Sequence, residues 1–76
     1  MRDLVEVLTR ALVDHPEQVD VKEVESESSV VVEVRVAPDD VGKIIGRQGR
    51  IARAIRTVVK AVAARDGKRA SVEILS

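Results

Sequence analysis

The sequence contains no Phe, Tyr or Trp and no cysteine among its 76 residues. Without aromatic rings the chain cannot build the stacking platforms on which many single-strand-binding proteins hold bases. Without cysteine it has no disulfide, thiolate metal site or thiol nucleophile. No apolar run approaches the ~20 residues of a membrane span, and the first residues lack a signal-peptide core. These absences predict a small cytoplasmic domain with an aliphatic core and no membrane attachment.

Charge is divided unequally along the chain, although the totals of 13 basic and 13 acidic side chains cancel. Residues 1–40 carry 4 basic and 11 acidic side chains, a balance of −7. Residues 41–76 carry 9 basic and 2 acidic side chains, a balance of +7. A separation of this size predicts a molecule whose basic part meets an anionic partner.

Hydrophobic periodicity predicts six elements in the order α-β-β-α-α-β. Their ranges are a helix over 4–13, strands over 19–24 and 30–36, a short helix over 40–45, a longer helix over 50–65 and a strand over 70–74. Asp3 would cap the first helix, Asp39 or Asp40 the second, and Gly67 would follow the third. Leu4, Val5, Leu8, Ala11 and Leu12 would form the buried stripe of the first helix. The first two strands should form a hairpin. The order of the six elements predicts one α+β domain with three helices on one face of a three-stranded sheet.

Glycine is concentrated where the charge is positive. Gly42, Gly46 and Gly49 are three of the chain's four glycines and fall within eight residues. Glycine allows close backbone approach, and the start of the helix that follows presents free N–H groups to an anion. Gly42 has two interpretations, close packing of a helix or direct contact with a ligand. The stretch predicts a backbone clamp on a polyanion.

A family resemblance is carried by the run Ile44-Ile45-Gly46-Arg47-Gln48-Gly49. It resembles the I-G-x-x-G loop that joins two helices in the KH (K-homology) domain. The predicted element order matches the prokaryotic, type II arrangement of that domain, so that residues 1–76 would form a single KH domain. The resemblance implies single-stranded RNA held in a narrow groove, with about four nucleotides clamped by the loop. Many KH domains have an aliphatic residue where this chain has Ala52, which implies weak base selectivity.

The predicted RNA-binding residues are the loop and its flanks: Lys43, Ile44, Ile45, Gly46, Arg47, Gln48, Gly49, Arg50 and Arg53. Ile44 or Ile45, with part of the strand over 32–36, would supply an aliphatic groove floor. Arg56 and Lys60 are interpreted as a solvated helix face. We expect weak, poorly sequence-selective binding, as in an RNA chaperone or post-transcriptional regulator. No cofactor, metal ion or small-molecule substrate is expected.

Other functions are weighed against this one. An enzyme is not expected, because no G-K-[ST] completes a P-loop and no nucleophile–His–acid set exists. A helix-turn-helix reader of duplex DNA would place residues 50–65 in the major groove. A protein-interaction adaptor would use the small side chains of residues 61–64 for close helix approach. The resemblance also implies a homodimer and a heteromer with a larger Jag-type KH protein.

Overall fold

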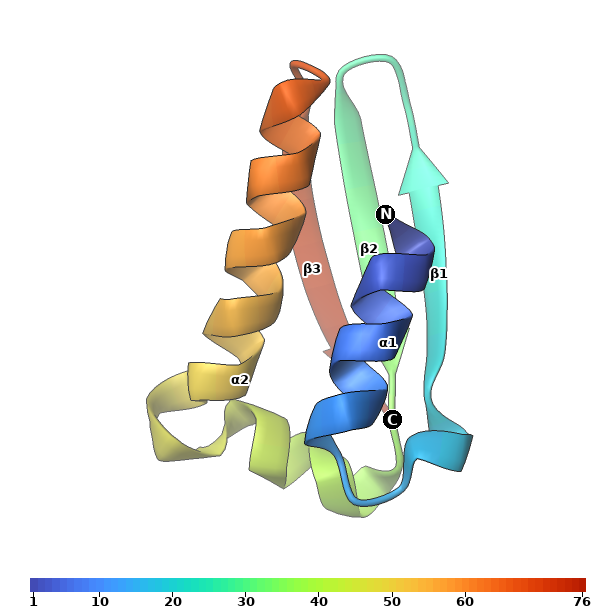
Figure 1. Ribbon diagram of the computed structural model, residues 1–76, viewed down its shortest axis with the longest axis vertical. Coiled ribbons are helices and arrows are strands. Elements are labelled where there is room, and N and C mark those ends of the chain that lie inside the picture. The colour runs from blue at the N-terminus through green and yellow to red at the C-terminus, as the bar shows by residue number, and fades with distance from the viewer.

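Two α-helices and three strands make up the fold in the computed structural model, which describes residues 1–76 (Figure 1). In chain order the elements are α1 (Arg2–Leu12), the 3₁₀ turn η1 (Pro16–Gln18), β1 (Asp20–Glu25), β2 (Ser29–Arg35), α2 (Pro38–Arg65) and β3 (Arg69–Leu75). The predicted ranges agree with these bounds to within one or two residues. The turn η1 was not predicted; it follows from Pro16, whose fixed φ favours a tight turn and whose carbonyl accepts the N–H of Val19.

The prediction of three helices is wrong in number. The helices expected over 40–45 and 50–65 are the two arms of α2, which bends sharply between them at the lower left of Figure 1. Only the residues from Gly46 to Gly49 leave the right-handed helical conformation. Three of them adopt the left-handed conformation, which interrupts the right-handed coil and makes the sharp kink at which the two arms meet.

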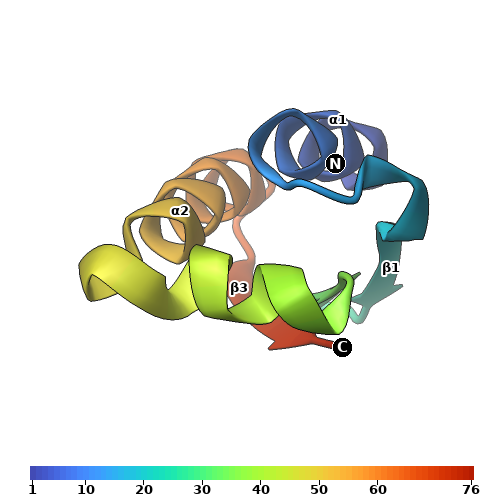
Figure 2. The same ribbon diagram turned by 90° about the horizontal axis from the view of Figure 1, so that it is seen from below.

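The sheet has the strand order β1-β2-β3. Strands β1 and β2 pair antiparallel with Val24 opposite Val31, so the predicted hairpin is confirmed. Strands β2 and β3 pair in parallel with Val32 opposite Val72, and α2 makes the crossover that a parallel pair requires. Both helices lie on one face of the sheet (Figure 2). The bend of α2 therefore lies at one end of the sheet, beside the end of β3.

The core between helices and sheet is aliphatic. Its largest fully buried apolar side chains are Ile44, Ile55, Val5, Val21, Val32, Val34 and Val59. Burying each such side chain contributes about 1.5–3 kcal/mol, which replaces the aromatic packing that the sequence lacks. The predicted stripe of α1 is partly wrong, because Val5 and Thr9 face the core whereas Leu4 remains 49% exposed. The helix is rotated so that positions four residues apart face the sheet.

The predicted N-terminal caps are also wrong, whereas Gly67 follows the end of α2 in the left-handed conformation as predicted. Helix α1 begins after Met1 and α2 after Ala37, and neither cap residue makes a side-chain hydrogen bond. The Asp40 carboxylate is fully buried and accepts the backbone N–H groups of Asp14 and His15, each at 3.0 Å. Two hydrogen bonds between its oxygens and amides of another segment satisfy this buried carboxylate better than one cap would. Asp40 thus ties the chain after α1 to the first arm of α2.

Candidate nucleic-acid interface

The bend of α2, residues 46–49, is hereafter called the glycine loop, and its backbone is strained. Arg47 and Gln48 have positive φ angles of 52° and 62°, and Gly49 has φ of 67°. For residues with a Cβ, this left-handed conformation costs about 1–2 kcal/mol each. Backbone strain of this kind is concentrated at functional sites. The loop therefore carries a cost that folding alone does not explain.

Two glycines near the bend are not required by the fold. Gly46 has φ of −65° and ψ of 172°, which any residue adopts, and a Cβ built there meets no atom within 4 Å. A Cβ at Gly42 also meets nothing, so close helix packing does not explain that residue. Within a helix glycine costs about 0.5–1 kcal/mol relative to Ala. The space beside Gly42 is therefore open to solvent and not filled by another part of the chain.

A cavity of about 470 Å³ opens beside the bend. We call it the loop cavity; its lining residues are Gly42, Lys43, Gly46, Arg47, Arg50 and Ile51. Four of these, Lys43, Gly46, Arg47 and Arg50, belong to the predicted site. Gly42 and Ile51 were outside it, although the placement of Gly42 one turn before Gly46 was a signal that could have included it. The cavity combines two side-chain-free backbone positions with three cations and one aliphatic side chain.

The remaining predicted residues lie outside the cavity lining. Ile44 is fully buried in the core, where it supports the first arm of α2, whereas Ile45 is 56% exposed. Gln48 and Arg53 are exposed and Gly49 is half-buried. The expected groove floor is wrong at Val32, Val34 and Val36, because all three are buried beneath the helices. The half-exposed aliphatic residues on this side of α2 are instead Ile51 and, on β3, Val72 and Ile74.

The cations of the loop cavity differ in their partners. Arg47 and Arg50 make no ion pair and no side-chain hydrogen bond, and the same holds for Arg53. The Lys43 ammonium donates to Asp14 Oδ1 at 2.9 Å. This hydrogen bond, and then the charge of Lys43, hold the pKa of Asp14 below its ordinary value of 3.8. Two of the three cations are therefore available to an anion without breaking any contact.

A second, smaller cavity of about 190 Å³ lies farther along α2, against β3. Its lining residues are Arg56, Lys60, Ala70, Ser71 and Val72. Arg56 and Lys60 make no ion pair, and they continue the row of cations that begins at Arg53 along the helix. Both residues were expected on a solvated face of the helix. The sequence could not predict this cavity, because its other wall is β3, whose position depends on the fold.

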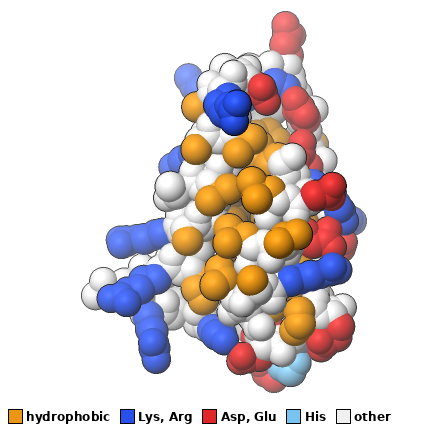
Figure 3. All heavy atoms as spheres, viewed as in Figure 1, with side chains coloured by type: hydrophobic (Ala, Val, Ile, Leu, Met, Phe, Trp, Pro, Cys, Tyr) orange, Lys and Arg blue, Asp and Glu red, His pale blue; other side chains and the backbone are white.

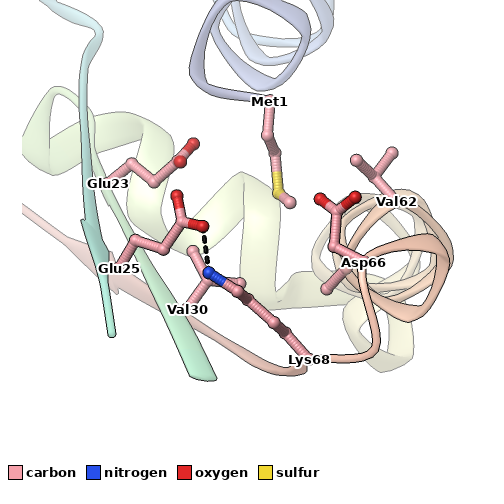
Figure 4. Close-up of a pocket in the computed structure, with 8 residues that line it drawn as sticks. Met1, Glu23, Glu25, Val30, Val62, Asp66 and Lys68 are labelled. Carbon is pink, nitrogen blue, oxygen red and sulfur yellow. Dashed lines mark hydrogen bonds and ion pairs between the residues drawn. The ribbon is translucent and has the colours of Figure 1, made fainter. Parts of the chain in front are cut away.

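A third cavity, of about 210 Å³, lies at the opposite end of the sheet and is acidic (Figure 4). Glu23, Glu25 and Asp66 point toward it, and Lys68 donates a hydrogen bond to Glu25. Three carboxylates against one ammonium repel an anion. No group of three or more His, Asp or Glu side chains is arranged to hold a metal ion. Neither helix is long and apolar enough to pass through a lipid bilayer.

Comparison with known proteins agrees with this architecture. Residues 2–74 match the family model described as "KhpA/KhpB, KH domain". The chain is 55% identical to RNA-binding protein KhpA of Clostridium perfringens, over 99% of this chain and 100% of that protein. It is 49% identical to RNA-binding protein KhpA of Aquifex aeolicus, over 99% of this chain and 95% of the other. No solved structure matches the chain significantly. The chain therefore belongs to the KhpA/KhpB family of KH domains.

Proposed function

We propose that this protein binds single-stranded RNA through its phosphate backbone at the glycine loop. The observation that carries the proposal is the loop cavity, where Gly42 and Gly46 are not needed for folding and Arg47 and Arg50 are unpaired. Glycine lets a sugar-phosphate chain approach the protein backbone, and arginine binds phosphate oxygens through a planar set of donors. The relatives at 55% and 49% identity are named RNA-binding proteins.

RNA is expected to follow α2 from the loop cavity toward the second cavity. The unpaired cations Arg53, Arg56 and Lys60 lie along this path, and Ile51 and Val72 present aliphatic surface to bases. Phosphate contacts give affinity without sequence information, and the chain has no aromatic side chain on which to stack a base. We therefore propose weak sequence discrimination and a role as an RNA chaperone or post-transcriptional regulator.

The decisive experiment reverses charge in the loop. Replacing Arg47 and Gln48 by Asp in one variant places two carboxylates at the cavity, and the affinity for an unstructured single-stranded RNA should fall at least about tenfold. Both side chains are exposed, so the melting temperature should stay near that of the wild type. Fluorescence anisotropy with a labelled oligonucleotide of about 12 nucleotides measures the affinity.

The matched control carries the same change of charge at a distant place. Replacing Lys22 and Ser28 by Asp also changes the net charge by three, on β1 and its hairpin turn. This control should keep most of the RNA affinity. Equal losses in both variants would mean that net charge alone governs binding and would reject the loop as the site. Tighter binding of duplex DNA than of single-stranded RNA would favour the helix-turn-helix alternative.

A second function, self-association, is supported by the surface of α1. Its exposed apolar face consists of Leu4, Val7 and Ala11, of which Val7 is 69% exposed, and the half-buried Leu8 borders it. Figure 3 shows apolar side chains gathered over this helix and between the two helices, with basic residues along the left edge and acidic and basic residues mixed along the right edge. A copy related by a two-fold axis that runs along the helices would bring the basic edge of one chain against the carboxylates on the mixed edge of the other. We propose a homodimer through this face, and the same face for a larger Jag-type KH protein.

The self-association proposal is tested by mass in solution. Val7→Asp places a charge in the centre of the apolar face and should convert a dimer to a monomer with little loss of folded stability. A wild type that stays monomeric at high concentration would refute the homodimer. It would leave the RNA-binding proposal intact, since the glycine loop is formed within one chain.

A further inference from the structure

Asp14 is the carboxylate that lies against the border of the loop cavity. It lies two residues after the end of α1, and its Oδ1 atom is 2.9 Å from the ammonium of Lys43. Lys43 is one of the three cations that line the cavity, and it alone among them has an acidic partner. The acidic half of the molecule therefore reaches the proposed RNA site at this one point.

The position of Asp14 is fixed by its own backbone. Its N–H group donates to Oδ1 of the buried Asp40, while the neighbouring N–H of His15 donates to Oδ2. Asp40 and Lys43 belong to the same arm of α2, so Asp14 contacts that arm through both its backbone and its side chain. Because the backbone is anchored, forming the ion pair orders fewer groups than an ordinary surface pair does. The Lys43 hydrogen bond, and then the Lys43 charge, lower the pKa of Asp14, so the carboxylate stays ionised even in mildly acidic solution.

An RNA phosphate that enters the loop cavity meets two obstacles at this point. It must share Lys43 with Asp14 or displace the carboxylate, and it approaches a second negative charge at close range. Neither obstacle exists at Arg47 or Arg50, which have no acidic partner. We propose that Asp14 is a built-in counter-ion that occupies Lys43 in the unbound protein and lowers the RNA affinity of the loop cavity. This inference rests on the proposed RNA-binding function.

The test removes the charge of Asp14 and keeps its size. Asp14→Asn retains the backbone N–H that Asp40 binds, so the fold should be unaffected. The dissociation constant for the labelled single-stranded RNA should decrease about two- to five-fold at low salt, the range expected for an exposed ion pair. Glu17→Gln is the matched control, because it removes the same charge nearby from a residue that contacts His15 and not Lys43. Its dissociation constant should change by less than that of Asp14→Asn.

A double variant distinguishes the effect of Asp14 on Lys43 from a general repulsion between its negative charge and RNA. In a Lys43→Ala background, Asp14→Asn should have no larger effect than Glu17→Gln, because the cation that Asp14 occupies is gone. Equal effects of Asp14→Asn and Glu17→Gln in the wild-type background would overturn the inference, as would weaker binding by Asp14→Asn. A wild type that binds no RNA refutes the proposed function and the counter-ion with it. A wild type that binds RNA with an inert Asp14 refutes the counter-ion alone.

Discussion

Charged residues in the two halves of the molecule have different partners. In residues 1–40, Glu6 pairs with both Arg2 and Arg10, and the buried Asp40 is satisfied by two backbone N–H groups. Residues 41–76 contain nine basic side chains, of which only Lys43 and Lys68 form ion pairs, leaving seven without one. Both of these pairs reach across to carboxylates of the first half. The first half uses most of its charges within the fold, whereas the second half leaves most of its cations open to solvent.

The unpaired cations of residues 41–76 should matter little for folding stability and much for RNA affinity. Exposed ion pairs contribute only about 0–1 kcal/mol, so leaving seven cations unpaired costs the fold little. The same cations raise the affinity for a polyanion, because each phosphate that they neutralise releases condensed counterions. Changes in the second half should therefore alter RNA affinity more than stability. The glycine loop gives the sharpest form of this comparison.

Among single substitutions, the largest effect on RNA affinity is expected from Gly46→Ala. The added methyl group meets no protein atom, so the free energy of unfolding should stay within about 0.5 kcal/mol of the wild type. The methyl group would stand where the RNA backbone approaches, and the affinity should fall about tenfold, the effect of one lost hydrogen bond to a charged group. Chemical denaturation and anisotropy titration measure the two quantities on the same preparation.

Gly67→Ala is the control with the opposite profile. Gly67 follows α2 with φ of 69°, where Ala is strained by about 1 kcal/mol or more. This glycine lies at the other end of α2 from the loop, so RNA affinity should be unchanged while stability falls. If Gly46→Ala destabilised the protein as much as Gly67→Ala, glycine at position 46 would serve folding, and the contrast would fail.

The fold was largely predictable because its signals are local. Alternating valines predicted β2, and the aliphatic period of residues 50–65 predicted the second arm of α2. The count of helices was wrong because the two predicted helices meet at the short kink of residues 46–49 as the arms of α2, which the sequence does not reveal. The contacts of Asp40 and the burial of Ile44 were also missed. Both depend on how segments far apart in the sequence pack together, and local periodicity contains no such information.

The candidate site was predictable to a similar extent. Clustered glycines and cations indicated four of the six residues that line the loop cavity, because those residues are neighbours in the sequence. The cavity against β3 was missed since Arg56 and Ser71 are brought together only by the fold. The pairing of Lys43 with Asp14 was missed for the same reason. Whether a cation is available or already paired is a property of the tertiary structure.

A smaller effect should distinguish two cations of the loop cavity. Arg50 is unpaired, so Arg50→Ala should reduce the slope of log affinity against log salt by about 0.7, the single-strand value for one phosphate contact. Lys43 already has Asp14 as counter-ion, so Lys43→Ala should reduce the slope by clearly less. Binding measured at four or more salt concentrations gives both slopes. Equal reductions would show that Asp14 does not hold Lys43 back from RNA.

The smallest effect concerns the ion pair of Lys68 with Glu25, which is distant from the glycine loop. The hydrogen bond from Lys68, and then its charge, hold the pKa of Glu25 below its ordinary value of 4.5. A carboxylate with a depressed pKa adds stability above its unfolded-state pKa, and this stability is lost as the pH falls through the folded-state pKa. In Lys68→Met, that part of the pH dependence should disappear.

Melting temperatures at pH 6 and pH 3 measure this effect. The wild type should lose more stability between these two pH values than Lys68→Met, since only the wild type must protonate a stabilised Glu25 carboxylate. Lys68 also donates to the carbonyl of Ser26, so the variant should melt lower at both pH values, and the informative quantity is the difference between them. RNA affinity at neutral pH should not change. A marked loss of RNA affinity in Lys68→Met would contradict the proposal that Lys68 stabilises the fold and that only the unpaired cations of residues 41–76 bind RNA.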